Sequence, residues 1–142
     1  DGAILAGLMA HPYFDRPAPK SLDRDAFDPA PIAGLTPEDG AATLAAFTVA
    51  AIARARALFP RPARRWLVTG GGRHNPVIMT AMAAALDTPV DPVESVGWDG
   101  DALEAQAFAY LAVRSLDGLP LSLPTTTGVK RPMTGGRLYR KG

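Results

Sequence analysis

One short stretch of the sequence limits the fold more than any other, because it joins a strand signal, three glycines and a helix start. Trp66–Thr69 is an apolar run bounded by turn residues, which predicts a short buried strand. Gly70–Gly72 follow at once, and without Cβ atoms they let the backbone approach another group closely. Asn75 can cap a helix whose first position is Pro76 and which runs to about Leu86. The chain is therefore expected to turn sharply from a strand into a helix here.

This glycine-rich turn has a functional and a purely structural interpretation. A helix start presents free N–H groups and the positive end of a dipole, which suits phosphate or another polar ligand group. The stretch is neither the G-x-G-x-x-G dinucleotide fingerprint nor a phosphate loop with Gly-Lys-Ser/Thr. The structural alternative is a tight strand-to-helix turn. Three consecutive glycines exceed what a turn requires, so we favour ligand contact by Gly70, Gly71 and Gly72, with Asn75 beside them.

Two further helices are expected before this turn. Residues 2–10 have the composition of the end of a helix, stopped by Pro12. A long helix is expected to begin at Thr36 as the cap, with Pro37 at the first position, and to reach about Leu58. Its apolar stripe predicts that it packs on a core.

After the turn, the pattern predicts one more strand and one more helix. Residues 89–96 favour a strand that Pro92 interrupts, which suits a sheet edge. A helix is expected from about Asp99 to Leu116, and because it is apolar over most of its circumference it should be sandwiched in the core. The order of elements indicates an α/β fold, although two strands are few for a self-sufficient sheet.

The connections are rich in proline. Residues 11–21 contain three prolines, so they should be extended and irregular, and the adjacent Tyr13 and Phe14 should pin them to a surface. The expected division of the chain is an irregular connecting segment after a helix at 1–35, an α/β core at 36–118 and a Pro-, Gly- and Thr-rich tail at 119–142.

Composition excludes several classes of partner. The 142 residues carry 15 basic and 14 acidic side chains, a net charge of +1, which gives no reason to expect a nucleic-acid partner or an acidic membrane surface. The chain has no cysteine, which suits a reducing compartment. We expect no membrane span, since no apolar run approaches about 20 residues. The first residues lack a basic leader, and a start at Asp1 suggests a processed, truncated or excised chain.

Few residues suggest other chemistry. His11 and His74 are the only histidines and lack metal-ligand spacing, so no protein metal site is expected. Ser21 has no glycine elbow, which argues against a serine hydrolase. Glu104 lies one turn into the apolar helix expected from about Asp99 to Leu116, where its carboxylate could bind sugar hydroxyls or simply complement the helix dipole. Residue physics alone favours the dipole interpretation.

Three separated segments together resemble a known family. The matching residues are Val68–Met79, Asp101–Ala112, and Leu119–Pro120 with Leu123–Gly128; Pro12–Phe14 and Pro19–Arg24 also fit. In this order and spacing they resemble the C-terminal portion of bacterial anhydro-N-acetylmuramic acid kinases. The resemblance covers nearly the whole chain. Each motif is weak alone, because glycine triplets before helices are common in actin-like kinases.

The resemblance implies a fold and an activity. The fold would be α/β, the C-terminal lobe of an actin-like (ribonuclease H-like) kinase, with helices packed on a mixed sheet. The family opens the 1,6-anhydro ring of anhydro-N-acetylmuramic acid with water and transfers the γ-phosphoryl group of ATP to O6, a cytoplasmic step of cell-wall recycling. ATP and Mg²⁺ are the implied cofactors. The implied partners are the anhydro amino sugar, the rest of the same polypeptide and a second copy in a homodimer.

The resemblance also assigns roles to residues. Gly70, Gly71, Gly72 and Asn75 would face the nucleotide, and Glu104 would reach the sugar. The family's catalytic aspartate and first phosphate loop lie upstream of the matching portion, and Asp1 does not fit the aspartate's local pattern. The chain alone is therefore expected to hold no catalytic residue and to be inactive. The alternatives are another actin-like sugar or acid kinase, a chaperone-like ATPase, or a non-catalytic binding domain on the same scaffold.

Overall fold

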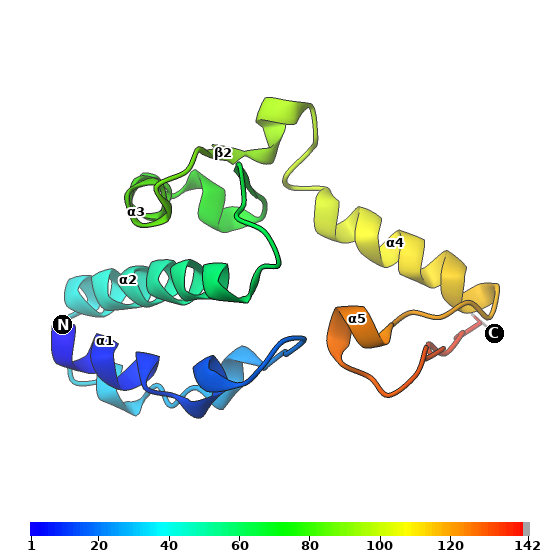
Figure 1. The fold of residues 1–142 in the computed structure, drawn as a ribbon, viewed down its shortest axis with the longest axis horizontal. Coiled ribbons are helices and arrows are strands. Elements are labelled where there is room, and N and C mark those ends of the chain that lie inside the picture. Colours follow the sequence, from blue (N-terminus) through cyan, green and yellow to red (C-terminus); the bar gives the residue numbers. More distant parts are fainter. Residues whose placement is uncertain (141–142) are drawn as a thin grey trace.

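The protein is mostly helical with one small sheet. The computed structural model describes residues 1–140. Its helices and strands follow one another as shown in Figure 1: α1 (Gly2–Met9), α2 (Pro37–Ala55), β1 (Trp66–Val68), α3 (Pro76–Leu86), β2 (Val90–Pro92), α4 (Leu103–Leu116) and α5 (Pro124–Thr127). Short 3-10 turns occur at Pro12–Asp15, Arg24–Ala26, Ala30–Ile32, Arg56–Leu58, Gly71–His74 and Val93–Val96.

The helix starts are where the sequence predicted them. Thr36 caps α2, because its hydroxyl oxygen accepts from the N–H of Asp39 at 3.2 Å. Asn75 caps α3, and its Oδ1 accepts from the N–H groups of Val77 and Ile78 at 3.0 and 3.3 Å. In both helices proline occupies the first position, where no intrahelical N–H is lost.

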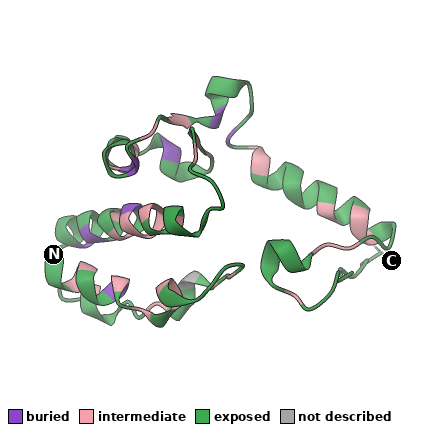
Figure 2. Ribbon diagram, in the orientation of Figure 1, coloured by how far each residue is buried: buried purple, intermediate pink, exposed green. Residues whose placement is uncertain are grey.

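The two strands form a parallel pair joined through α3. Trp66 lies opposite Val90, and Val68 opposite Pro92. The buried core consists of Val49, Met82 and Leu86, so it lies where α2 and α3 pack together beside the sheet. Partly buried side chains surround it: Ile52, Ala53, Trp66, Val68, Ile78, Ala81 and Val90. Figure 2 shows that burial concentrates in this part of the molecule.

Two expectations about the sheet need correction. The second strand is shorter than the predicted 89–96, because Pro92 ends it and residues Val93–Val96 form a 3-10 turn. Proline has no N–H with which to continue the ladder. Within the described residues the sheet is also purely parallel, whereas a mixed sheet was expected.

The proline-rich connection is held by its aromatic residues, as predicted. Phe14 lies 6.0 Å from Phe27 and 6.1 Å from Phe47 of α2, measured between ring centroids. Tyr13 contributes differently, since the Lys20 ammonium lies 4.7 Å from its ring centroid. Lys20 also donates to the carbonyl oxygens of Tyr13 and Phe14 at 2.9 and 3.0 Å. These contacts fasten the segment against α2.

The expected burial of the helix from about Asp99 to Leu116, which is α4 in the structure, is wrong for this chain. No residue of α4 is buried, and its large apolar side chains Phe108 and Leu116 are 64% and 65% exposed. Figure 1 shows that α4 runs away from the layers formed by α1, α2 and α3. The helix itself ends as predicted, with Gly118 in the left-handed region at φ +65°. The division into a core at 36–118 and a tail stays a prediction.

One helical stretch is longer than expected, because the sequence pattern predicted no apolar segment of about 20 residues. Residues Pro37–Leu58 span 22 residues and are long and apolar enough, by length and composition alone, to cross a membrane. Packing helices of water-soluble proteins pass the same test. Here α2 contacts α1 and α3, and it carries Glu38, Asp39 and Arg54 in its end turns. These contacts support a packing role for α2.

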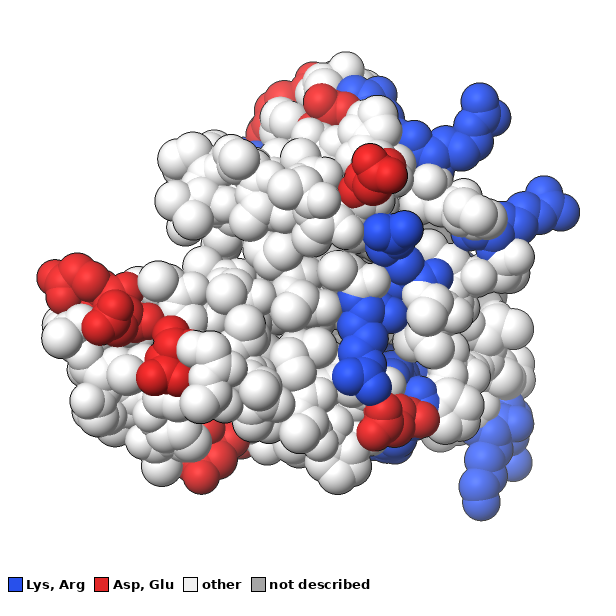
Figure 3. All heavy atoms as spheres, turned by 60° about the vertical axis from the view of Figure 1, so that its left-hand side comes forward, with Lys and Arg blue, Asp and Glu red and all other residues white. Residues whose placement is uncertain are grey.

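Charged side chains are unevenly distributed despite the small net charge. Figure 3 shows Lys and Arg side chains forming a band down one side of the drawn face, with acidic side chains gathered at the opposite edge and at points along the band.

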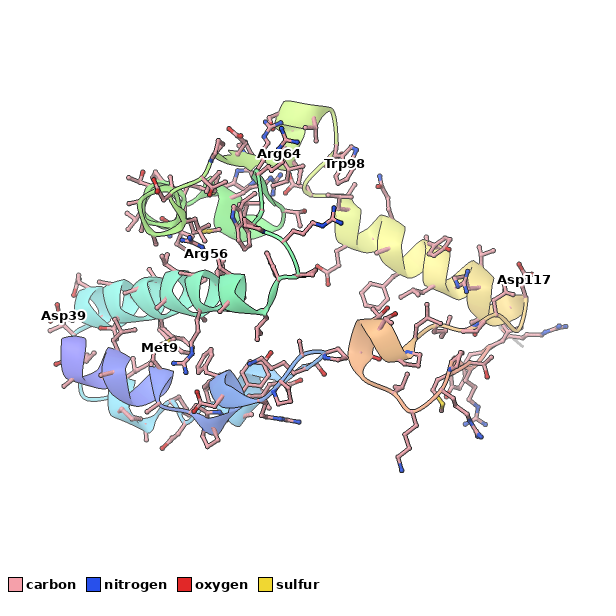
Figure 4. All side chains as sticks on the ribbon, viewed as in Figure 1. Met9, Asp39, Arg56, Arg64, Trp98 and Asp117 are labelled. Carbon is pink, nitrogen blue, oxygen red and sulfur yellow. The ribbon has the colours of Figure 1, made fainter. Side chains whose placement is uncertain are left out.

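One basic residue joins the end of α2 to α3. Arg56, labelled in Figure 4, donates from Nη1 to the carbonyl oxygen of Ala85 at 3.2 Å.

Candidate functional site

The glycine loop lies at the carboxyl end of β1, as predicted. Gly70 follows the strand with φ +76° and ψ 177°, a conformation that is essentially restricted to glycine. The chain does not pass directly into α3. Residues Gly71–His74 form a 3-10 turn first, and Asn75 then opens the helix. In parallel α/β units, loops at the carboxyl ends of strands are the usual place for ligands.

Gly71 and Gly72 differ from Gly70, because neither their backbone conformation nor their steric surroundings require glycine. Neither has a positive φ, and a Cβ atom built on either would meet nothing within 4 Å. Within the described part of the chain their backbone N–H groups also donate no hydrogen bond to another backbone group. The loop therefore holds two exposed glycines whose N–H groups have no backbone acceptor among the described residues.

A buried arginine holds this loop in place. The Arg73 side chain is only 3% exposed, and it touches two carboxylates. Its Nε and Nη2 each lie 2.8 Å from Oε1 of Glu94, which follows β2, and its Nη1 lies 2.8 Å from Oδ1 of Asp101, just before α4. Nη1 also donates to the carbonyl oxygen of Gly70 at 3.0 Å. We call Arg73, Glu94 and Asp101 the arginine clamp.

Gly100 completes the clamp because the space there admits no side chain. A Cβ at this position would overlap Arg73 Nε and would lie 2.7 Å from both Arg73 Cζ and Glu94 Oε1. The backbone of Gly100 instead joins the network. Its N–H donates to Glu94 Oε1 at 3.3 Å, and its carbonyl oxygen accepts from the Thr69 hydroxyl at 3.1 Å and from the Gly70 N–H at 3.4 Å.

The clamp residues shift one another's acidity. The hydrogen bond from Arg73 holds the pKa of Asp101 below its ordinary value of 3.8, against the opposing effect of desolvation. The pKa of Glu94 is also lowered, chiefly by a hydrogen bond from its own backbone N–H and then by Arg73. The hydrogen bond to Asp101 raises the pKa of Arg73 above its ordinary value. All three groups are therefore charged at neutral pH.

The other predicted site residues are only partly brought together. Asn75 adjoins the glycine loop, and its side-chain oxygen is already occupied by the α3 cap. Glu104 lies in the first turn of α4, three residues beyond Asp101, and is exposed, so the expectation that it is buried is wrong. The clamp nevertheless ties the segment that opens α4 to the glycine loop. Contact of Glu104 with a sugar stays a prediction.

Sequence reasoning did not identify the clamp. From the sequence, Arg73 belongs only to the glycine-rich stretch, and Asp101 belongs only to an expected helix start. Glu94 has no predicted role of its own. The sequence signal that could have predicted the clamp is an arginine directly after three glycines, together with acidic residues after the next strand. A cavity of about 680 Å³ lies elsewhere, between Tyr13, Lys20, Arg54 and Thr126. In the region covered by residues 1–140, no group of three or more His, Cys, Asp or Glu side chains could hold a metal ion.

Comparison with known proteins decides the family. The family model described as anhydro-N-acetylmuramic acid kinase matches residues 1–141. The chain belongs to the anhydro-N-acetylmuramic acid kinase family. Membership in that family implies an actin-like fold, of which the parallel β1–α3–β2 unit is the part seen here.

Curated members of the anhydro-N-acetylmuramic acid kinase family match this chain closely. The protein of that name from Rhodospirillum rubrum is 65% identical over 139 residues, which cover 98% of this chain and 37% of the relative. The protein from Paramagnetospirillum magneticum is 62% identical and matches 94% of this chain and 38% of its own length. That from Acidiphilium cryptum is 60% identical, matching 100% of this chain and 40% of its own length. The chain thus spans less than half the length of these relatives.

Proposed function

We propose that this chain is part of an ATP-dependent kinase that opens the 1,6-anhydro ring of anhydro-N-acetylmuramic acid and phosphorylates O6. The product would be N-acetylmuramic acid 6-phosphate, formed in the cytoplasm during cell-wall recycling. The observation that carries the proposal is the family match over residues 1–141, together with identities of 60–65% to curated kinases of that name. We use "parent enzyme" below for the full-length protein that contains this chain.

The glycine loop supports a role at the nucleotide. ATP supplies the phosphoryl group that is transferred, and its phosphates are negatively charged oxygen acceptors. The free N–H groups of Gly71 and Gly72 are suitable donors to such oxygens, and the absent Cβ atoms allow close approach. Asn75 would contribute from its amide nitrogen, since its oxygen caps α3. No described cluster suits Mg²⁺, so the metal would be held by the rest of the parent enzyme.

Glu104 is proposed to bind the sugar. Its carboxylate is exposed and lies in the first turn of α4, on the segment that the clamp ties to the glycine loop. Exposure leaves the carboxylate accessible to vicinal hydroxyls, which donate short hydrogen bonds to charged oxygens. The helix-dipole interpretation is the alternative for this residue.

Substrate choice is the direct test. The parent enzyme, incubated with ATP and Mg²⁺, is expected to phosphorylate anhydro-N-acetylmuramic acid in preference to glucose, glycerol or acetate. Mass spectrometry of the product would show one added phosphoryl group and one added water. Turnover of one of the other acceptors, with none of the anhydro sugar, would instead favour a different actin-like sugar or acid kinase.

The isolated chain provides a second test. Residues 1–142 are expected to give no phosphosugar under the same conditions, because the general base and the first phosphate loop of the family lie outside the matching portion. Turnover above background in a preparation free of contaminating kinase would contradict that reasoning. A parent enzyme that binds the sugar without any turnover would favour the non-catalytic alternative.

A further inference from the structure

Arg73 is a buried charged residue to which the proposed activity assigns no role. Its side chain is 3% exposed, yet it carries a charge and contacts three separate segments of the chain. These are the glycine loop at Gly70, the turn after β2 at Glu94 and the start of α4 at Asp101. Burying a charged group is costly unless it is paired and hydrogen-bonded, and here both conditions are met.

The contact of Arg73 with Asp101 matters because of where α4 lies. None of the α4 residues is buried, and none of the other helices of the described chain packs over it. Figure 4 shows the loop that carries Trp98 leading from the turn after β2 into α4. That loop includes Gly100, whose backbone bonds to Thr69 and Gly70. The clamp and these backbone bonds therefore fix how the start of α4 sits against the glycine loop.

We infer that Arg73 is a positioning residue that holds the nucleotide-binding glycine loop and the sugar-binding start of α4 as one rigid unit. The inference rests on the proposed function, because it takes the glycine loop to face ATP and Glu104 to face the sugar. Phosphoryl transfer depends on keeping the two reactants in a fixed relation. A single buried guanidinium bonded to both elements provides that relation inside one lobe.

The inference predicts a double kinetic effect in the parent enzyme. Arg73→Ala releases both elements at once, so the KM for ATP and the KM for the anhydro sugar should each rise by about ten- to a hundredfold. Asp101→Ala removes the carboxylate that Arg73 Nη1 and His74 Nε2 contact at the start of α4, and it leaves the bonds of Arg73 to Glu94 and Gly70 in place. It should therefore raise chiefly the KM for the sugar. Gly100→Ala should reproduce the Arg73→Ala pattern, because its Cβ would overlap the guanidinium.

Arg65 provides a matched control. Its Nε lies 2.8 Å from Asp91 Oδ2, and its Nη2 donates to Ser95 at 2.9 Å, so it also bridges to the second strand and the turn that follows. Arg65 touches neither the glycine loop nor α4 and is partly exposed. Arg65→Ala is therefore expected to leave both KM values unchanged.

Amide hydrogen exchange on the parent enzyme tests the clamp without relying on turnover. Exchange over residues 70–74 and 99–104 should accelerate together in Arg73→Ala and remain at the wild-type rate in Arg65→Ala. If Arg73→Ala does not yield folded enzyme, the same exchange measurement is made on Asp101→Ala and Glu94→Ala, each of which removes one carboxylate of the clamp. Unchanged exchange in both segments would overturn the clamp itself.

The kinetic results separate the possible failures. Unchanged kcat and unchanged KM values for both substrates in Arg73→Ala would reject the positioning role. A wild-type parent enzyme that ignores the anhydro sugar would reject the proposed function, and the exchange measurement would then decide whether the clamp exists. Raised KM values for both substrates, with Arg65→Ala unaffected, would support both proposals.

Discussion

Valine placed at Gly70 should chiefly lower stability, whereas valine placed at Gly71 should chiefly weaken nucleotide binding. At Gly71 the backbone has an ordinary φ, and a Cβ would meet nothing within 4 Å. At Gly70 the surroundings are equally open, but φ is +76° with ψ 177°. The two sites thus differ in conformation and share the same lack of steric contact.

The expected magnitudes follow from that difference. An L-residue held in the conformation of Gly70 costs about 1–3 kcal/mol, so Gly70→Val should lower the free energy of unfolding of the parent enzyme by that amount. Gly71→Val adds a side chain into open space and should change it by less than about 0.5 kcal/mol. A side chain at Gly71 would hinder the close approach of a phosphate group to the loop backbone, so ATP affinity should fall in Gly71→Val.

Two measurements on the parent enzyme check this pair. Urea unfolding gives the two free energies, and titration calorimetry with a non-hydrolysable ATP analogue gives the affinities. Equal destabilisation by the two substitutions would show that the Gly70 backbone is not as described. Unchanged nucleotide affinity in Gly71→Val, with the fold intact, would refute the assignment of the loop to ATP.

Three further outcomes are expected. Glu104→Gln in the parent enzyme should cost about 1.5–3 kcal/mol in sugar binding or transition-state stabilisation, with ATP affinity nearly unchanged. Wild-type kinetics in this variant would instead indicate that Glu104 only complements the helix dipole. Leu86→Ala, which empties a fully buried site, should lower the free energy of unfolding by about 2–5 kcal/mol, and a smaller loss in thermal or urea unfolding would place Leu86 outside the core. Because the folded-state pKa of Asp101 is lowered, its stabilisation is present above its ordinary value of 3.8 and is lost as the pH falls through the lowered value. Urea unfolding between about pH 5 and 2 should therefore show a smaller pH dependence in Arg73→Ala, and an identical dependence would contradict the ion pair.

Local signals predicted the local structure well. Thr36 and Asn75 cap the helices that follow them because capping depends on a side-chain oxygen and the next few N–H groups, which lie close in sequence. The placement of Gly70 after β1 could be predicted for the same reason. Phe14 was expected to bind a surface because aromatic residues in a proline-rich segment need a partner, and the partners proved to be Phe27 and Phe47.

Features that depend on distant residues could not be predicted in this way. The bonds of Arg73 to Glu94 and Asp101 join residues 21 and 28 positions apart, and no periodicity links them. The exposure of α4 was missed because an apolar circumference indicates what a helix can bury and does not indicate which segment covers it. The match to about 37% of a relative's length is consistent with a cover supplied from elsewhere in the parent enzyme.

The parallel pairing of β1 with β2 bears on how the parent enzyme reaches its native state. Trp66 and Val90 are joined through a single helix, so forming their contact closes a loop of modest length and costs little chain entropy. Each strand has only one partner among the residues that the structure describes, which leaves its other edge open to accept a further strand. We therefore expect the β1–α3–β2 unit to form before contacts between residues that lie farther apart in the sequence.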